Sequence, residues 1–369
     1  MRFLVMMFGV WASLAQATDY ALQPALPISS AAEEQLLDIT SAGSRVIAAG
    51  ERGVIVYSDD GGRSWTQAKV PVSETLTSLH FPTADHGWAV GHGGVILHSG
   101  DGGETWQQQL DGNDVNRQKL DFVTDRAMAL EAEVQESESE PDDDLIFELE
   151  EAQYAVEDAE AALDTGPADP FLDVWFADAS IGWAVGAYGM IFRTDNGGLQ
   201  WRIAAGGIEN LEGYHYYSLA AADGGTLYLS GEAGLIYRSD NGGDQWQRLD
   251  LDYDGSLFGV LALDTDRVLT FGLRGNIFLS EDRGDSWRSV APEGGPGLSY
   301  YGGRTLPGNS MVLVGAGGVM ASSSNGEQFT TDIHSARNTF SSAKSVDGDL
   351  LLVGMGGLVR IPAAREVSR

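Results

Sequence analysis

Residues 58–65 read SDDGGRSW, and five related stretches follow along the chain, the last of them degenerate. They are SGDGGETW (99–106), TDNGGLQW (194–201), SDNGGDQW (239–246), SEDRGDSW (280–287) and SSSNGEQF (322–329). Each copy comes shortly after a Gly-x-x-Gly element and a short apolar run. The first glycines of that second element are Gly50, Gly91, Gly186, Gly231, Gly272, Gly315 and Gly354. Their separations are 41, 95, 45, 41, 43 and 39 residues, so all but one agree on a period near 42. Seven copies at this period predict an all-β fold, a seven-bladed β-propeller with four strands in each blade.

The order of elements within one repeat places both motifs at turns. In the third repeat, FLDVWFAD is expected to be the innermost strand, GWAVG the second and MIFRT the third. The Gly-x-x-Gly element then joins the second strand to the third, where glycine tolerates a positive φ. The stretch that begins at Ser58, and its copies, join the third strand to the fourth.

The carboxylate of Asp60 is expected to accept backbone N–H groups within its turn, and the tryptophan to pack between blades. Two copies hold asparagine at this position, which favours hydrogen bonding over proton transfer. The residues given this structural role are Asp60, Asp101, Asn196, Asn241 and Asp282. A divalent-cation site at these turns is the alternative.

The ends of the chain suggest export and a closed ring. Residues 1–17, MRFLVMMFGVWASLAQA, have the basic start, short apolar run and small-residue end of a signal peptide cleaved after Ala17. The last repeat, ending LVRIPAAR, lacks a fourth strand. We expect the segment YALQPALPIS (20–29) to pair with it and so remove an open sheet edge.

Composition restricts the partners. The chain holds 54 acidic and 22 basic residues, a net charge of −32, which disfavours nucleic acid. It has no cysteine, hence no disulfide and no thiolate site. No run after the signal peptide is long and apolar enough to span a membrane. We expect a periplasmic monomer without a cofactor or a metal site.

The anomalous spacing of 95 residues indicates an insertion between the second and third blades. Residues 127–169 contain sixteen Asp or Glu and no Lys or Arg. Apolar residues recur there at steps of three and four, which predicts an antiparallel helical hairpin interrupted near Pro141. The expected seam consists of Val123, Ala127, Leu130, Val134, Leu145, Leu149, Ala152, Val156, Ala159 and Leu163. The hairpin is interpreted as a solvated arm, a docking arm for a basic or membrane-complex partner, or a cation site.

The predicted organisation is therefore a signal peptide (1–17), propeller blades 1 and 2 with the closing strand (18–115), the acidic insertion (116–169), blades 3 to 7 (170–362) and a tail (363–369). The insertion joins a fourth strand to a first strand, so it should leave from the face that carries the Gly-x-x-Gly turns and stand beside their side chains. Loops at a channel mouth are a usual place for binding. The candidate partner-binding residues on this face are Arg52, His92, Tyr188, Glu232, Arg274, Tyr216, Tyr217, Tyr300 and Tyr301.

The strands HGWAVG (86–91) and IGWAVG (181–186), with the two turn motifs, allow a family to be named. The sequence resembles the photosystem II stability and assembly factor family of Asp-box (BNR-repeat) β-propellers. The resemblance implies a lumenal chaperone of a reaction-centre subunit in photosynthetic members. In other bacteria it implies an exported accessory factor near envelope complexes, among them transporters of the resistance-nodulation-division type. The low content of basic residues, where the photosynthetic members use an arginine-rich patch, and the acidic insertion argue against a photosystem client.

An Asp-box glycoside hydrolase of the sialidase type is the competing interpretation. It requires two carboxyl groups across the scissile bond, and arginines that converge on the sugar carboxylate. Arg52, Arg274, Arg304 and Arg337 are the candidate arginines, and Glu51 and Glu232 the candidate carboxylates. No motif places them together, and we expect a non-catalytic scaffold.

Overall fold

The computed structural model describes residues 23–137, 141–167, 169–205, 207–208, 210 and 212–362. The predicted signal peptide and the predicted tail, 363–369, lie outside the described residues.

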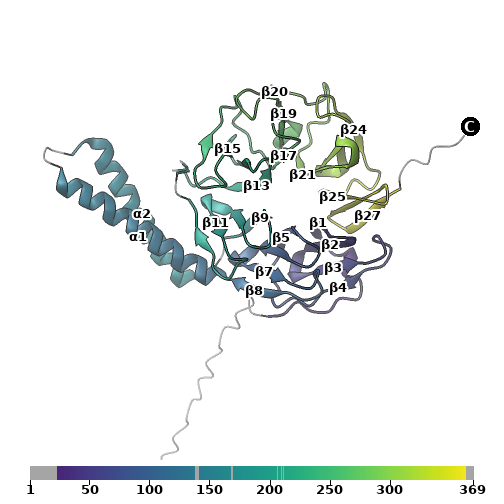
Figure 1. Cartoon of the computed structure of the whole chain (residues 1–369), viewed down its shortest axis with the longest axis horizontal. Coiled ribbons are helices and arrows are strands. Elements are labelled where there is room, and N and C mark those ends of the chain that lie inside the picture. The colour runs from purple at the N-terminus through teal and green to yellow at the C-terminus, as the bar shows by residue number, and fades with distance from the viewer. Residues whose placement is uncertain are drawn as a thin grey trace, which may run out of the picture.

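The chain forms a ring of seven sheets of antiparallel strands around a central channel, which confirms the predicted seven-bladed propeller (Figure 1). Six blades have four strands and the last has three. The strands of blades 1 to 4 are β1 (Leu36–Ala42), β2 (Arg45–Gly50), β3 (Ile55–Ser58), β4 (Thr66–Gln67), β5 (Leu76–His80), β6 (Gly87–Gly91), β7 (Ile96–Ser99), β8 (Gln107–Leu110), β9 (Phe171–Phe176), β10 (Gly182–Gly186), β11 (Ile191–Thr194), β12 (Arg202–Ile203), β13 (Tyr216–Ala221), β14 (Leu227–Gly231), β15 (Ile236–Ser239) and β16 (Gln247–Arg248). Those of blades 5 to 7 are β17 (Gly259–Ala262), β18 (Val268–Phe271), β19 (Ile277–Ser280), β20 (Arg288–Ser289), β21 (Tyr300–Thr305), β22 (Met311–Gly315), β23 (Val319–Ser323), β24 (Thr330–Ile333), β25 (Phe340–Val346), β26 (Asp349–Gly354) and β27 (Gly357–Ile361).

The hydrophobic core is divided among the interfaces between neighbouring blades. Seven clusters of buried side chains occupy these interfaces, one at each. The aromatic residue that ends each motif copy packs into the cluster shared with the preceding blade. Trp106 joins the cluster between blades 1 and 2, and Trp201 the cluster between blades 2 and 3. The motif therefore contributes directly to blade-to-blade packing, because a large apolar ring is removed from water there.

The ring closes differently from the expectation. No strand of the described residues pairs with the free edge of β27, so the predicted closing strand is not formed by residues 23–29. That segment bonds to blade 1 instead, where the Ala25 N–H donates to the Val70 carbonyl at 3.1 Å and the Ile28 N–H to the Gln67 side chain at 2.8 Å. The short helix η2 (Ala31–Glu33) then packs on β27. The chain thus contacts the start of β27 through a helical turn and adds no fourth strand to the last blade within the described residues.

The insertion is the predicted helical hairpin, formed by α1 (Gly112–Glu136) and α2 (Asp143–Thr165). Its seam is made by the expected residues with one exception, since Leu163 is 41% exposed. Figure 1 shows the hairpin projecting outward from the rim of the ring, away from the channel. Its base contacts β12 and the turn η4 (His92–Gly94), so the hairpin leaves from the face of the Gly-x-x-Gly turns and lies beside the candidate His92, as expected. Beyond that base it extends away from the channel (Figure 1). Within the described ranges, no helix has the length and apolarity needed to cross a membrane.

Candidate functional site

On one face of the ring, the Asp-box turns form closed hydrogen-bond units. The Asp60 carboxylate accepts from the Ser58 hydroxyl at 2.8 Å, from the Arg63 and Ser64 N–H groups at 2.9 Å, and from the Ser64 hydroxyl at 2.6 Å. These donors hold the pKa of Asp60 well below its usual range, the Ser64 hydroxyl contributing most. Asn196 accepts the corresponding bonds from Thr194 and Gln200.

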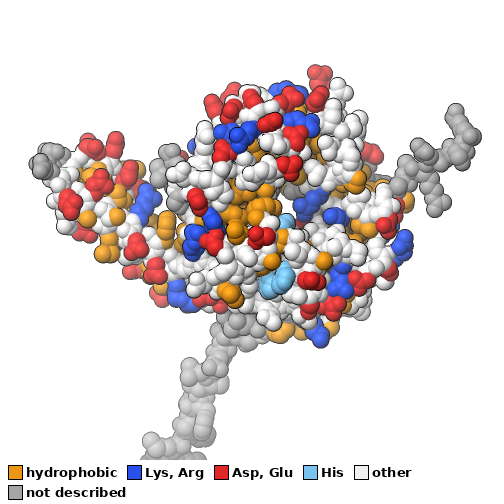
Figure 2. Space-filling model, viewed as in Figure 1, with side chains coloured by type: hydrophobic (Ala, Val, Ile, Leu, Met, Phe, Trp, Pro, Cys, Tyr) orange, Lys and Arg blue, Asp and Glu red, His pale blue; other side chains and the backbone are white. Residues whose placement is uncertain are grey.

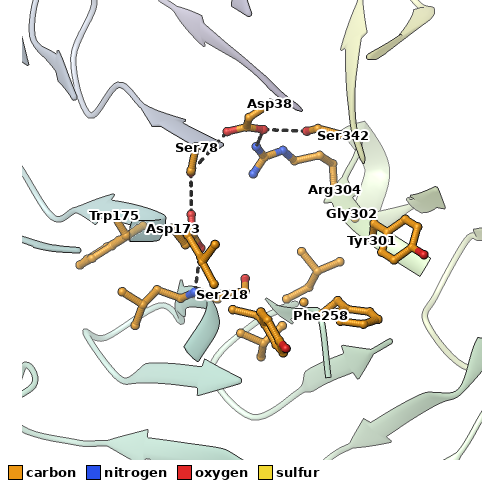
Figure 3. Close-up of a pocket in the computed structure, with 18 of the residues that line it drawn as sticks. Asp38, Ser78, Asp173, Trp175, Ser218, Phe258, Tyr301, Gly302, Arg304 and Ser342 are labelled. Carbon is orange, nitrogen blue, oxygen red and sulfur yellow. Dashed lines mark hydrogen bonds and ion pairs between the residues drawn. The ribbon is translucent and has the colours of Figure 1, made fainter. Parts of the chain in front are cut away.

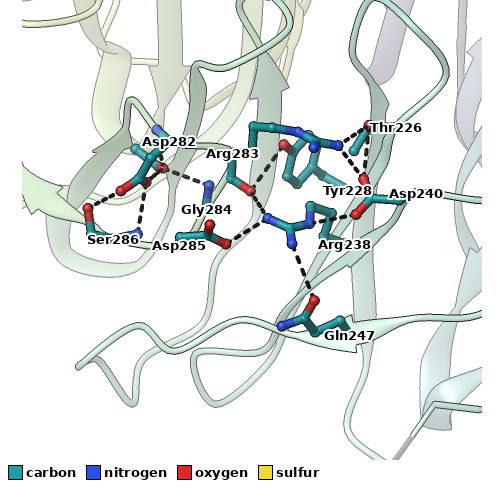
Figure 4. A network of polar contacts seen from close by, with 11 residues as sticks. Thr226, Tyr228, Arg238, Asp240, Gln247, Asp282, Arg283, Gly284, Asp285 and Ser286 are labelled. Carbon is teal, nitrogen blue, oxygen red and sulfur yellow. Dashed lines mark hydrogen bonds and ion pairs between the residues drawn. The ribbon is translucent and has the colours of Figure 1, made fainter.

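Arginines on this face connect the turns of neighbouring blades. Arg238 of blade 4 donates to the Arg283 carbonyl and to the Asp285 carboxylate of blade 5, both at 2.8 Å (Figure 4). Arg193 makes the same kind of contact with Asp244 of the next blade at 2.6 Å. The polar groups of the Asp-box face are thus largely used within the fold, which leaves this face few groups for chemistry.

On the opposite face, the Gly-x-x-Gly turns hold a strained position. The first glycine has an extended backbone and is required by space, because a Cβ on Gly50 would lie 2.0 Å from the Gln35 carbonyl oxygen. The third residue of each Gly-x-x-Gly turn has a left-handed backbone conformation. Three of the candidate residues stand there: Arg52, Tyr188 and Arg274, with φ of 58°, 52° and 58°. Such angles are costly for residues other than glycine and are often associated with function. His92 and Glu232 stand at the second position of their turns, where the left-handed third position is held by Gly93 and Ala233, so these two candidates are not equivalent to the other three.

The predicted partner-binding residues divide into exposed and buried groups. Tyr188 and Tyr301 are 62% and 42% exposed, whereas Tyr216 and Tyr300 are 1% and 2% exposed. The last two belong to the clusters between blades, so their assignment to the binding surface is wrong.

The charged candidates do not converge on the channel. Arg52 pairs with Glu34. Glu232 accepts the His215 N–H at 3.3 Å, and the Arg274 N–H donates to Ser299 at 3.1 Å.

Five aromatic rings form a continuous line on this face, which we call the aromatic arc. The centroids of Tyr188 and His215 are 4.8 Å apart, and those of His215 and Tyr217 are 6.2 Å apart. The line continues from Tyr217 to Phe258 at 5.2 Å and from Phe258 to Tyr301 at 5.4 Å. It crosses four blades and ends over the central channel. Partly exposed aromatic rings are typical anchors of protein interfaces.

Sequence reasoning missed His215 and Phe258. Phe258 lies 14 residues before Gly272, the same spacing that separates Tyr217 from Gly231 and Tyr301 from Gly315. That spacing was sufficient to find it. Tyr217 and Tyr301 stand at β-bulges, where the pairing register shifts between Tyr216 and Ser218 and between Tyr300 and Gly302. A bulge turns one additional side chain toward the mouth, as bulges often do beside functional sites.

Below the arc, the innermost strands enclose a cavity of about 480 Å³ (Figures 2 and 3). Its polar walls consist mainly of Asp38, Ser78, Asp173, Arg304 and Ser342, which we call the polar girdle. Asp38 accepts from Ser342 at 2.7 Å and from Arg304 Nη2 at 2.8 Å. Asp173 accepts from Ser78 at 2.7 Å. The girdle joins blades 7 and 6 to blade 1, and blade 2 to blade 3.

Burial in the cavity shifts the pKa values of two side chains, Asp173 and His80. Burial, to which the nearby Asp38 adds, raises the pKa of Asp173 to about 6. Burial, with the Arg304 charge, lowers the pKa of His80 to about 4. His80 Nδ1 accepts the Phe176 N–H at 3.1 Å, so the neutral ring carries its proton on Nε2. Perturbed groups in a cleft are a recognised sign of a functional site.

The arrangement expected of a glycosidase is not found in the described residues. Of the four candidate arginines only Arg304 lines the cavity, and neither Glu51 nor Glu232 does. The described part of the chain also groups no three His, Asp or Glu side chains that could hold a metal ion.

Fold and turn motifs define an Asp-box β-propeller, and comparison with known proteins identifies its family. The family model described as photosynthesis system II assembly factor YCF48 matches residues 58–127 and 154–331. The chain therefore belongs to this family. Its sequence has no match among curated proteins.

Solved structures agree on the architecture. YCF48 bound to D1 peptide superposes with a TM-score of 0.60 at 14% identity, covering 90% of this chain and 94% of that one. YCF48 from Cyanidioschyzon merolae gives 0.60 at 15% identity, with 93% and 99% covered. The WD40 propeller domain of Doa1 gives 0.61 at 12% identity, with 94% and 97% covered. At these identities the likeness establishes the fold.

Proposed function

We propose that the protein is an exported, non-catalytic scaffold that binds a protein partner during the assembly or operation of an envelope membrane complex. The aromatic arc carries this proposal, since it gathers exposed rings on the face opposite the self-contained Asp-box turns. Membership of a family of assembly factors, one of whose solved structures is a complex with a peptide, supports a protein partner.

The hairpin is the second surface that we assign to the partner. Six of the eleven large hydrophobic side chains exposed in the described residues lie on it. Phe147 and Tyr154, 60% and 61% exposed, are seven residues apart and so share one side of α2. Acidic residues surround them, and the segment 127–169 contains no basic residue. Charge complementarity therefore favours a basic segment of the partner that also carries apolar side chains.

The arc is tested by site-specific crosslinking in cells. A photoreactive phenylalanine analogue at Tyr301 should capture the partner, and the same analogue at Leu199 should not. Leu199 is the matched control because it is 83% exposed but lies in an Asp-box turn. In a separate affinity purification from envelope extracts without a crosslinker, Tyr217→Ala with Tyr301→Ala should lose the partner that the wild type retains. Identical products from both positions would contradict the proposal.

The hairpin is tested by removing residues 113–166. Gly112 and Pro167 are adjacent, since a Cβ on Gly112 would lie 2.1 Å from that of Pro167, so a short glycine linker can join the ends. The shortened protein should keep the propeller and lose the part of the partner affinity that weakens as salt is added. An unchanged affinity at low and high salt would assign the hairpin to solvation alone.

Export is tested separately. We expect the mature protein in the periplasmic fraction, with an N-terminus that mass spectrometry places after Ala17. An uncleaved cytoplasmic protein would overturn this part of the proposal.

A further inference from the structure

The cavity beneath the aromatic arc contains hydrogen-bond donors without acceptors. Arg304 uses Nη2 to pair with Asp38, and no other described residue accepts from its remaining N–H groups. Figure 3 shows its guanidinium group projecting into the cavity from β21. A guanidinium carries five N–H donors in a planar fork that suits a carboxylate or a phosphate.

The two carboxylates of the cavity are already satisfied. Besides Ser342 and Arg304, Asp38 accepts the Ile39 and Leu79 N–H groups at 2.8 and 2.9 Å. Asp173 accepts the Val174 and Leu219 N–H groups at 2.9 and 2.8 Å, in addition to Ser78. Seven donors thus occupy four oxygens. An incoming cation would have to displace bonds that hold the blades together, whereas an anion would meet free donors.

Lys344 holds on β25 the register position that Arg304 holds on β21, since each pairs with the residue three before the first glycine of the next turn, Leu351 and Val312 respectively. Lys344 therefore adds a second cation at the same level of the neighbouring innermost strand. Burial, and then the Arg304 charge, lower its pKa, and it forms no ion pair or hydrogen bond with a described residue. An anion between the two groups would relieve their mutual repulsion. The neutral His80 also lines the cavity, and its Nε2–H has no acceptor among the described residues.

The shape of the cavity narrows the kind of anion. Tyr217, Phe258 and Tyr301 line the mouth, and Arg304 lies on the same strand as Tyr301. A volume of about 480 Å³ is within the usual range for a bound small group. A ligand that reaches Arg304 from this face must pass the rings, so an apolar or aromatic group beside its anion would be buried against them.

We propose that the cavity binds a carboxylate of the partner that is adjacent to an aromatic residue, with Arg304 and Lys344 as the binding cations and Tyr217, Phe258 and Tyr301 as the aromatic wall. This inference rests on the proposed function and specifies its chemistry. The carboxylate comes either from an acidic side chain or from the end of a chain.

Three small probes distinguish these sources by calorimetric titration of the intact protein. N-acetylphenylalanine carries the carboxylate at a chain end, and N-acetyl-Phe-Glu amide carries it on a side chain. N-acetylphenylalanine amide carries none. At least one acid should bind roughly 10- to 100-fold more tightly than the amide, because charge-assisted hydrogen bonds to Arg304 are lost with the amide. Equal affinities of all three, or no binding of either acid, would overturn the proposal.

Variants locate the site. Lys344→Met should weaken the acid about tenfold and leave the amide unchanged, without disturbing the girdle. Arg304→Gln should abolish the preference for the acid, and thermal melting establishes that this variant is folded. Arg288→Gln, on the exposed outer strand β20 and outside the cavity, is the control and should bind like the wild type. Wild-type affinity in both Arg304→Gln and Lys344→Met would contradict the assignment.

Failure of the inference and failure of the proposed function give different results. If the Tyr301 crosslink captures a partner but neither acid binds, only the carboxylate site is wrong. If an acid binds in the cavity but no partner is captured, the scaffold function is wrong and the cavity is a small-molecule site.

Discussion

On one face of the propeller, Asp60, Asp101 and Asp282 make nearly the same hydrogen bonds in three different blades. On the other face, equivalent positions of the innermost strands hold Leu37, Thr77, Leu172, Tyr217, Phe258, Tyr301 and Ser341. The Asp-box positions repeat because each one closes the same turn. The mouth positions are free to differ because their side chains leave the sheet and enter the channel.

The difference also appears in the hydrogen bonds. In the Asp-box turns each carboxylate bonds mostly within its own turn. In the polar girdle Asp38 bonds to residues of blades 2, 6 and 7. Loss of an Asp-box carboxylate should therefore be local, whereas loss of Asp38 should weaken the closure of the ring.

The largest expected effect is that of Asp38→Ala. It leaves Arg304 and the Leu79 N–H without their acceptor inside the channel. Asp38 is buried but the Arg304 side chain is 39% exposed, so solvent offsets part of the penalty and we expect a loss of about 2–3 kcal/mol. Denaturant unfolding should show this loss in the free energy of unfolding. A loss below about 1 kcal/mol would mean that the girdle does not close the ring.

The stability of the channel and that of the Asp-box turns should change with pH in opposite directions. The pKa of Asp173 is raised to about 6, so the folded state binds its proton more tightly than the unfolded state does. Its contribution favours folding below about pH 4 and is lost as the pH rises toward 6. The pKa of Asp60 is lowered, so its contribution is present above about pH 4 and is lost on acidification below that value.

Subtracting the free energy of unfolding of a variant from that of the wild type at each pH isolates the contribution of one carboxyl group from those of the other acidic residues. The stability of the wild type minus that of Asp173→Asn should fall between about pH 4 and 6. The same difference for Asp60→Asn should fall as the pH is lowered below about 4. Two differences of the same sign would show that the channel and the turns are not electrostatically distinct.

A smaller effect is expected within the Asp-box turns. Asp101→Ala removes the acceptor of the Thr105 N–H and of the hydroxyl groups of Ser99 and Thr105, and should cost about 1–2 kcal/mol. Asp101→Asn should be close to neutral, because Asn196 and Asn241 serve in sibling turns. Thermal unfolding of the two variants measures the contrast. Equal losses would assign the role to charge instead of hydrogen bonding.

The smallest effect concerns the strained turn position. Tyr188 has a φ of 52°. Tyr188→Gly should be about 1 kcal/mol more stable than Tyr188→Ala, because only glycine adopts this angle without strain. The two variants should bind the partner equally weakly, since both lack the ring. Equal stability of the two variants would show that the backbone at the third residue of the Gly-x-x-Gly turn is not strained.

The sequence predicted most of the hairpin seam but not its direction. Ala152 is buried and Val123, Ala127 and Leu130 are half-buried, as the spacing of three and four requires. Leu163 is exposed because α2 ends two residues later, where the seam has passed to Ala162. The outward course of the hairpin depends on the packing of Gly112 against Gly94, which no periodicity encodes.

The face that carries the aromatic arc could be predicted only in part. The spacing of 14 residues to the next glycine singles out Tyr217 and Tyr301, but without that comparison the adjacent Tyr216 and Tyr300 were assigned to the same face. That distinction depends on the bulge in each innermost strand, because one extra residue decides which of two neighbours points into the channel.

By itself, the sequence determined the number of blades, the turn motifs and the presence of the acidic hairpin, because each of these is a local pattern repeated at a constant spacing. Only the tertiary structure decided that η2 contacts the start of β27, that Asp38 and Arg304 meet across the channel, and that five rings form one arc. Asp38 and Arg304 are 266 residues apart in the chain. Their contact exists because the ring brings the first blade beside the last two, which is a property of the closed fold and not of any one repeat.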